Sequence, residues 1–97
     1  MVKNEKNWSF PQDIDFEMVI QYVIEFEETQ WPEKIIFDLS KTKYIHSSFI
    51  GFLINAKQKA EKINAELSLL ISPELEKIFI KMDLIKFLPY LLVKKSA

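Results

Sequence analysis

The chain has 97 residues, of which 48% are hydrophobic and 28% charged, and its formal net charge at pH 7 is −1. This length favours one domain with one modest core, so we expect a single domain over residues 1–97. The composition is too apolar for a disordered chain. Lysines and carboxylates are interspersed rather than gathered into a basic block, which argues against a nucleic-acid partner.

Several kinds of site lack the residues they need. The chain has no cysteine, one histidine, His46, and one glycine, Gly51. Disulfides, thiolate metal sites, histidine clusters and glycine-rich phosphate-binding loops are therefore excluded, and we expect no cofactor and no metal. No apolar run approaches the roughly 18 residues that a membrane-spanning helix needs, and residues 1–8 do not resemble a leader. We expect a cytoplasmic protein without membrane insertion.

The first predicted helix covers residues 13–28, with Asp13 or Asp15 as its N-cap. Its apolar residues fall in one broad stripe that we expect to face the core, namely Phe16, Val19, Ile20, Val23 and Phe26. Before this helix, residues 8–10 can supply one short strand at most. We expect residues 1–9 to be either flexible or a short edge strand.

A strand and a second helix follow. Residues 34–39 form a short apolar run bounded by polar turn residues, which predicts a buried strand. Residues 47–63 have helical periodicity, and Ser47 or Ser48 is a suitable N-cap. The residues expected on the core face of this helix are Phe49, Phe52, Leu53, Ala56, Ala60 and Ile63.

The C-terminal third repeats this alternation. Residues 65–71 predict a strand, and Ser72-Pro73-Glu74 opens a third helix that buries Leu75, Ile78, Phe79 and Met82. Residues 90–93 are a candidate final edge strand. Strands that alternate with helices indicate parallel pairing through right-handed crossovers. We therefore predict an α/β fold with a mostly parallel sheet of about four strands, covered by about three helices.

Gly51 is the residue that most needs an explanation. It lies inside the second predicted helix, where glycine costs about 0.5–1 kcal/mol relative to alanine. In helical projection it falls near Ser47, and Asn55 and Gln58 continue the same stripe away from the core. We expect this stripe to be exposed. Ile50 and Ile54 lie at its edge, where they either cover a neighbouring helix or contact another protein.

At these residues a resemblance appears. The sequence Lys34-Ile35-Ile36-Phe37-Asp38-Leu39-Ser40, followed by Tyr44-Ile45-His46-Ser47-Ser48-Phe49-Ile50-Gly51-Phe52-Leu53-Ile54, is similar to the core of a STAS domain. That family typically has a strand ending in Asp-Leu-Ser and an Asp-Ser-Ser/Thr-Gly-Leu-Gly segment that opens a helix. The similarity continues through residues 66–75 and 82–89. It implies a small STAS-like fold and a non-catalytic regulator that binds a partner protein.

The resemblance also implies a site. In STAS anti-sigma-factor antagonists the first serine of this segment is phosphorylated by a partner kinase, and that serine corresponds to Ser47. The implied partner is an anti-sigma factor or a serine-kinase-like ATPase, which binds a monomer or weak dimer of this chain. The candidate partner-binding residues are Asp38, His46, Ser47, Ser48, Ile50, Gly51, Ile54, Asn55 and Gln58.

Three departures from the family pattern keep alternatives open. His46 replaces the usual aspartate, Phe49 replaces the first glycine, and the region before Phe16 is short. The missing aspartate and the short N-terminal region suit an accessory subunit of a lipid-transport ABC ATPase, in which no phosphorylation is needed. His46 is expected to be partly buried with one hydrogen bond, or else to act as a pH-sensitive group.

Asp38 has a structural interpretation, as a carboxylate that bonds loop N–H groups, beside its place among the candidate partner-binding residues. An acyl-transfer enzyme that uses Asp38, His46 and Ser47 is the third hypothesis. Adjacent His46 and Ser47 side chains would have to meet across a helix cap, which is an awkward geometry.

Overall fold

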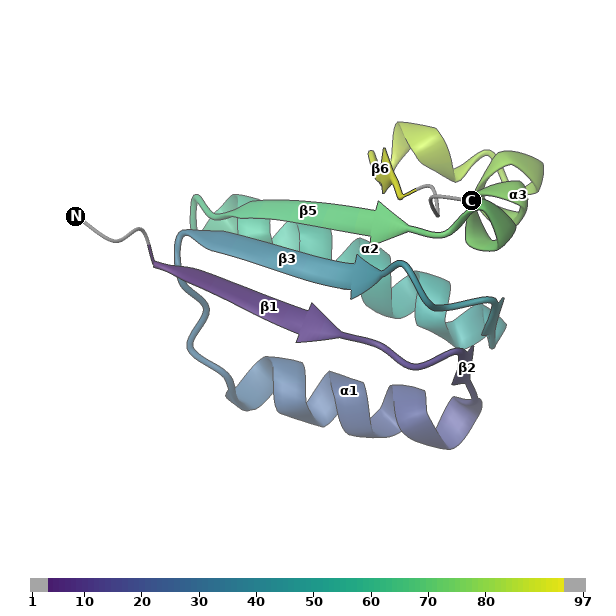
Figure 1. Cartoon of the computed structure of the whole chain (residues 1–97). Helices are drawn as coiled ribbons and strands as arrows, with labels where there is room; N and C mark the ends of the chain where they lie inside the picture. The colour runs from purple at the N-terminus through teal and green to yellow at the C-terminus, as the bar shows by residue number, and fades with distance from the viewer. Residues whose placement is uncertain (1–3, 94–97) are drawn as a thin grey trace.

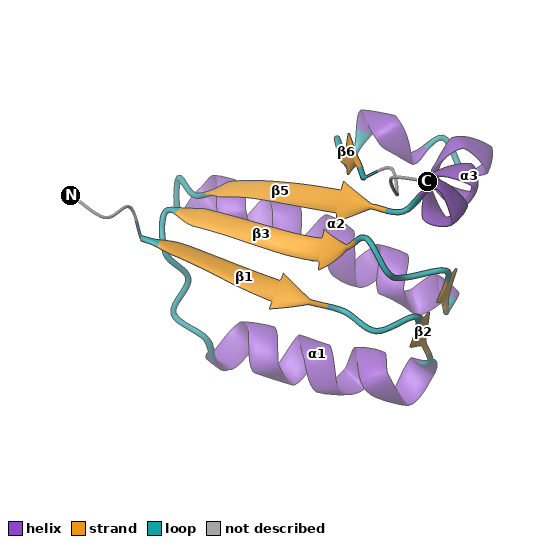
Figure 2. Ribbon diagram, viewed as in Figure 1, coloured by secondary structure: helices purple, strands orange, loops and turns teal. Residues whose placement is uncertain are grey.

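The computed structural model describes residues 4–93, so residues 1–3 and 94–97 of the expected domain lie outside the described part (Figures 1 and 2). The three α-helices are α1 (Phe16–Glu28), α2 (Ser47–Lys62) and α3 (Pro73–Lys81). The strands are β1 (Glu5–Ser9), β2 (Asp13–Ile14), β3 (Lys34–Leu39), β4 (Tyr44–Ile45), β5 (Glu66–Ile71) and β6 (Leu91–Leu92). A 3-10 helix, η1 (Leu84–Lys86), follows α3.

The main sheet has four parallel strands in the order β1-β3-β5-β6. The predicted α/β class, with about four strands and three helices, is confirmed. Because each crossover steps in the same direction across the sheet and crossovers are right-handed, α1 and α2 lie on the same face (Figure 1). In β3, Ile35, Phe37 and Leu39 are buried on this face. α1 and α2 thus cover one face of the sheet. The sequence predicted helices over the sheet without indicating which face they cover.

The N-terminal segment contributes more than the sequence predicted. β1 pairs with β3 along its whole length and forms an edge of the main sheet, and β2 pairs with β4 in a separate two-stranded sheet. The expectation of one short strand at most before Phe16 is therefore wrong. β1 has little apolar pattern because most of its side chains are exposed, and β2 is two residues long.

The core is rich in aromatic rings packed between the sheet and the two helices. Trp8 of β1 stacks on Phe10 with ring centroids 5.0 Å apart and on Trp31 at 5.7 Å. Phe37 of β3 stacks on Phe52 of α2 at 6.0 Å. The Trp31 indole N–H donates to the Phe26 carbonyl at 2.9 Å, so its polar atom is satisfied.

Local signals define the helix ends. Asp15 is the N-cap of α1 and accepts from the Met18 N–H at 2.9 Å. Ser72 caps α3 by accepting from the Leu75 N–H at 3.1 Å, and Pro73 occupies the first turn. Ile63 and Met82, which were expected to be buried, follow the ends of α2 and α3 and are exposed.

Candidate functional site

The start of α2 is capped by His46, where we expected Ser47 or Ser48. His46 has an extended backbone, and its Nδ1 accepts from the Ser48 N–H at 3.1 Å and lies 2.8 Å from Ser48 Oγ. The serines already lie inside the first turn, so the residue before them supplies the cap. His46 is exposed, which corrects the expectation of a partly buried ring.

Two further contacts hold this helix start beside α1. The His46 N–H donates to the Ile14 carbonyl at 2.8 Å, directly after the β2–β4 pairing. The Phe16 ring at the start of α1 lies 5.4 Å from the His46 ring, measured between centroids. Ser47 and Ser48 therefore lie close to the first turn of α1.

We name Ser47, Gly51, Asn55 and Gln58 the α2 stripe. All four residues are exposed on one side of the helix, as expected from the spacing. Within residues 4–93 the Ser47 hydroxyl has no hydrogen-bond partner, because Ser48 takes the contact with His46. A Cβ at Gly51 would have no neighbouring atom within 4 Å. The fold thus does not need glycine for internal packing here.

The remaining candidate residues separate into different environments. Ser48 is half-buried beside α1, and Ile54 is half-buried in a hollow that Gln58 and Phe87 also line. Ile50 is only 8% exposed and belongs to the core, so it offers no contact surface.

Asp38 is not brought together with the α2 stripe. Its carboxylate accepts from the Ser40 N–H at 3.0 Å and from the Ser40 hydroxyl at 2.6 Å, which is the loop-bonding role considered above. Because side chains alternate along β3, Asp38 lies on the sheet face opposite the helices. It lines a separate hollow with Phe10, Pro11 and Lys41.

A groove that the sequence did not predict lies between α1 and α2. It has a volume of about 380 Å³, and from α2 it is lined by Ser48, Gly51, Phe52 and Asn55. From α1 it is lined by Val19 and by four side chains that remain exposed: Phe16 (52%), Ile20 (43%), Val23 (44%) and Ile24 (48%). Phe16, Ile20 and Val23 were expected to face the core, so that prediction is wrong. Val19 and Phe26 are the residues of α1 that are fully buried.

A signal for this groove was present in α1. Eight of its thirteen residues are apolar or aromatic, and in helical projection they surround most of the helix. One sheet and one neighbouring helix cannot cover so broad an apolar surface. The excess predicts an exposed apolar strip, although not which side it occupies.

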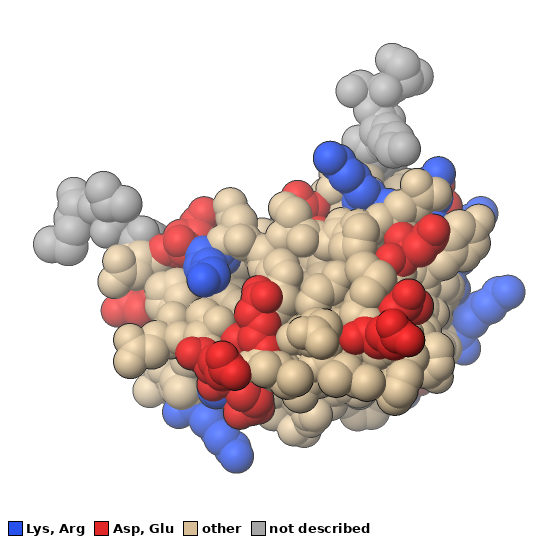
Figure 3. Space-filling view, turned by 90° about the horizontal axis from the view of Figure 1, so that it is seen from below, with Lys and Arg blue, Asp and Glu red and all other residues tan. Residues whose placement is uncertain are grey.

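The charges around α1 are one-sided. Residues 13–28 contain six carboxylates and no lysine, although charges are mixed over the chain as a whole. Figure 3 views the molecule from the side of α1 and shows carboxylates distributed over this face, with uncharged surface between them and lysines mainly toward the margins. Glu27 forms an ion pair with Lys59 of α2 at 3.8 Å.

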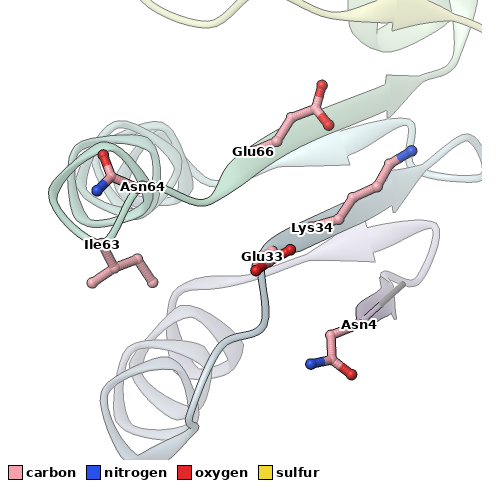
Figure 4. Close-up of a pocket in the computed structure, with 6 residues that line it drawn as sticks. All are labelled: Asn4, Glu33, Lys34, Ile63, Asn64 and Glu66. Atoms are coloured by element: carbon pink, nitrogen blue, oxygen red, sulfur yellow. The ribbon is translucent and has the colours of Figure 1, made fainter. Parts of the chain in front are cut away.

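Further hollows lie away from the groove. One of about 390 Å³ lies at the amino ends of β3 and β5 and is lined by Glu33, Lys34, Asn64, Glu66 and two other residues, whose side chains point in different directions (Figure 4). Within residues 4–93 there is no group of three or more potential metal ligands.

The hypothesised acyl-transfer set is not assembled either. Asp38 bonds Ser40 and His46 bonds Ser48, so neither side chain contacts Ser47. A catalytic triad needs its three side chains within hydrogen-bond reach, and these three are engaged elsewhere.

Comparison with known protein families gives a match. The family model described as the STAS domain matches residues 10–96, a range that begins directly after β1 and includes the whole α2 stripe. The search of curated proteins and the search of solved structures each found no match. No helix in the described part of the chain combines the length and the apolar character needed to cross a membrane.

Proposed function

Because this chain belongs to the STAS domain family, we propose that it is a non-catalytic regulatory module that docks a partner protein through the α2 stripe. STAS domains typically mediate protein–protein interaction. The observation that carries the proposal is Gly51, a costly residue inside α2 with open space where a side chain would begin. A partner backbone can approach the helix closely at such a position.

The partner in this proposal is an anti-sigma factor or a related serine-kinase-like ATPase, and Ser47 is the residue it modifies. The exposed Ser47 hydroxyl is free to accept a phosphoryl group. Phosphorylation adds about −1.5 to −2 charges. At the positive end of α2 the modified side chain is tolerated by the fold, while its charge and hydration weaken docking.

A second candidate function is an accessory subunit of a lipid-transport ABC ATPase that needs no phosphorylation. Two observations favour it. His46 occupies the position of the aspartate that usually precedes the acceptor serine, and the exposed apolar residues of α1 adjoin the α2 stripe. A permanent subunit interface is larger and more apolar than a transient one.

The test is affinity capture from a cytoplasmic extract with wild type, Ser47→Asp and Ser47→Ala, read by mass spectrometry for partners and phosphate. A kinase that wild type and Ser47→Ala retain but Ser47→Asp loses supports the phosphorylation switch. Equal retention of a transport ATPase by all three proteins rules out the switch and supports the accessory subunit.

Two further variants test the surface itself. Gly51→Trp places a large side chain on the α2 stripe, at a position where the Cβ has open space around it, and is expected to abolish capture of either partner. Ser9→Asp adds the same charge as Ser47→Asp, but at an exposed residue of β1, and it is expected to leave capture of the partner unchanged. Full retention of the partner by Gly51→Trp would show that docking uses another surface.

A further inference from the structure

The α1 side of the α1/α2 groove has no partner within the described residues. Phe16, Ile20, Val23 and Ile24 are each close to half exposed although all are apolar, and they lie in one row along the helix. A contiguous exposed apolar patch of this kind commonly marks an interaction site. The row covers about 12 Å of helix axis, which matches two to three turns of a second helix.

The charges bordering this row restrict what can occupy the groove. In helical projection Glu17 and Glu28 follow Ile24 on the side away from α2. Among the described residues, Glu17, Glu25 and Glu28 have no lysine within ion-pair distance, and the opposite wall is formed by the uncharged Ser48 and Asn55. We call Phe16, Ile20, Val23 and Ile24 the apolar floor of the groove, and we call Glu17 and Glu28 its acidic rim.

We infer that this groove binds an amphipathic basic helix of the partner protein, an inference that rests on the proposed function and names the chemistry of its partner. Apolar residues of that helix, spaced three and four apart, would pack against Ile20, Val23 and Ile24, as in other helix-in-groove complexes. Its lysines or arginines would face Glu17 and Glu28.

The acidic rim disfavours the other occupants. In a dimer formed through this face, the carboxylates of Glu17 and Glu28, which border the groove, would meet the same carboxylates of the second copy. A membrane with anionic headgroups would be repelled by the same carboxylates. A basic helix is the one occupant that both the apolar floor and the rim attract.

The test uses a synthetic peptide of about 14 residues with leucine at helical i, i+3, i+4 and i+7 spacing and lysine elsewhere. The matched peptide has glutamate in place of every lysine. Titration into the ¹⁵N-labelled full chain is followed by NMR, and affinity is measured by calorimetry at low and high salt. We expect the lysine peptide alone to bind, more weakly at high salt, with shifts centred on Ile20, Ile24, Gly51 and Asn55.

Variants separate the two parts of the groove. Ile20→Ser with Ile24→Ser is expected to lower peptide affinity at least about ten-fold. Glu17→Gln with Glu28→Gln is expected to lower it several-fold and to flatten the salt dependence. The controls are Ile80→Ser, an equally apolar exposed residue on α3, and Glu33→Gln, an exposed carboxylate outside α1, and both should bind as wild type.

Four results would overturn the inference. The first two are equal binding of both peptides and NMR shifts centred outside the groove. The third is dimerisation of the chain that persists at high salt and is abolished by Ile20→Ser with Ile24→Ser. The fourth is binding to zwitterionic vesicles through Ile20 and Ile24. The proposed function is judged separately by capture. Suppose that Gly51→Trp no longer captures a native partner while Ile20→Ser with Ile24→Ser still captures it. This result would support docking through the α2 stripe and would refute the binding of a basic helix in the groove.

Discussion

At Gly51 the requirements of folding and of binding diverge. The open space around the glycine means that an added methyl group meets nothing, while alanine is the better helix former. We predict that Gly51→Ala raises the free energy of unfolding by about 0.5–1 kcal/mol, measured by urea denaturation monitored by circular dichroism. A destabilised Gly51→Ala would mean that the glycine has a role in the backbone of α2, and the argument for a binding role would then fail.

The N-cap of α2 is a histidine, His46, where the sequence predicted a serine. The paired serines correctly indicate where α2 begins, but serine is so common an N-cap that the sequence favours Ser47 or Ser48 over the preceding histidine. An imidazole Nδ1 two residues before an N–H occupies the position that an aspartate oxygen would take. His46 thus caps α2 although it is not one of the usual N-cap residue types.

Among the elements, a hydrogen bond joins the residue just before β6 to α3. The Tyr90 hydroxyl donates to Glu76 Oε2 at 3.0 Å just before β6 begins. Burial raises the pKa of Tyr90 above its ordinary value, and the hydrogen bond to Glu76 and the charge of Glu76 raise it further. Ionised Tyr90 would lose its donor and face a carboxylate.

The pH dependence follows from the direction of this shift. Above the ordinary tyrosine value of about 10, the unfolded chain loses the Tyr90 proton before the folded chain does. The stabilisation is therefore complete below that pH and is lost as pH rises through the folded pKa. We predict that wild type is more stable than Tyr90→Phe at pH 8 and that this advantage shrinks above pH 10, measured by urea denaturation. If the stability difference between wild type and Tyr90→Phe stayed the same above pH 10, it would contradict the raised pKa of Tyr90.

For α1, the periodicity of apolar residues predicts the helix but not which of its sides is buried. Its existence and its Asp15 cap could be predicted because both are local properties of the sequence. Its buried side could not, because the apolar residues surround most of the helix and the positions of α2 and the sheet decide which are covered. Val19 and Phe26 face those neighbours, while Ile20 and Ile24 face the groove.

The same distinction governs the candidate site. The α2 stripe was predictable because a helix with a clear core face leaves its opposite side exposed. The groove was not, because it is created by two helices that are separate in sequence and meet only in the folded chain. The family resemblance placed Asp38 in the site, and helical projection placed Ile50 at the edge of the stripe. The alternation of side chains along β3 and the packing of α2 override both predictions.

At the scale of the whole molecule, the order of the strands determines which surfaces are available. All crossovers proceed in one direction, so α1 and α2 lie on one face of the sheet, and both the α2 stripe and the groove lie on that side. The acidic segment 13–28 lies there too, while the rest of the chain carries thirteen lysines and eight carboxylates. A net charge of −1 conceals this asymmetry.

The folded unit extends beyond the match to the family, because β1 contributes Trp8. This ring contacts Tyr22, Phe37 and Phe52 edge-on, and so joins the sheet to both covering helices. We predict that Trp8→Ala lowers the free energy of unfolding by about 3 kcal/mol, measured by urea denaturation. Asn7→Ala, on the exposed side of the same strand, should change it by no more than about 0.5 kcal/mol. If both substitutions changed the free energy of unfolding by the same amount, β1 would not contribute to the core of the domain.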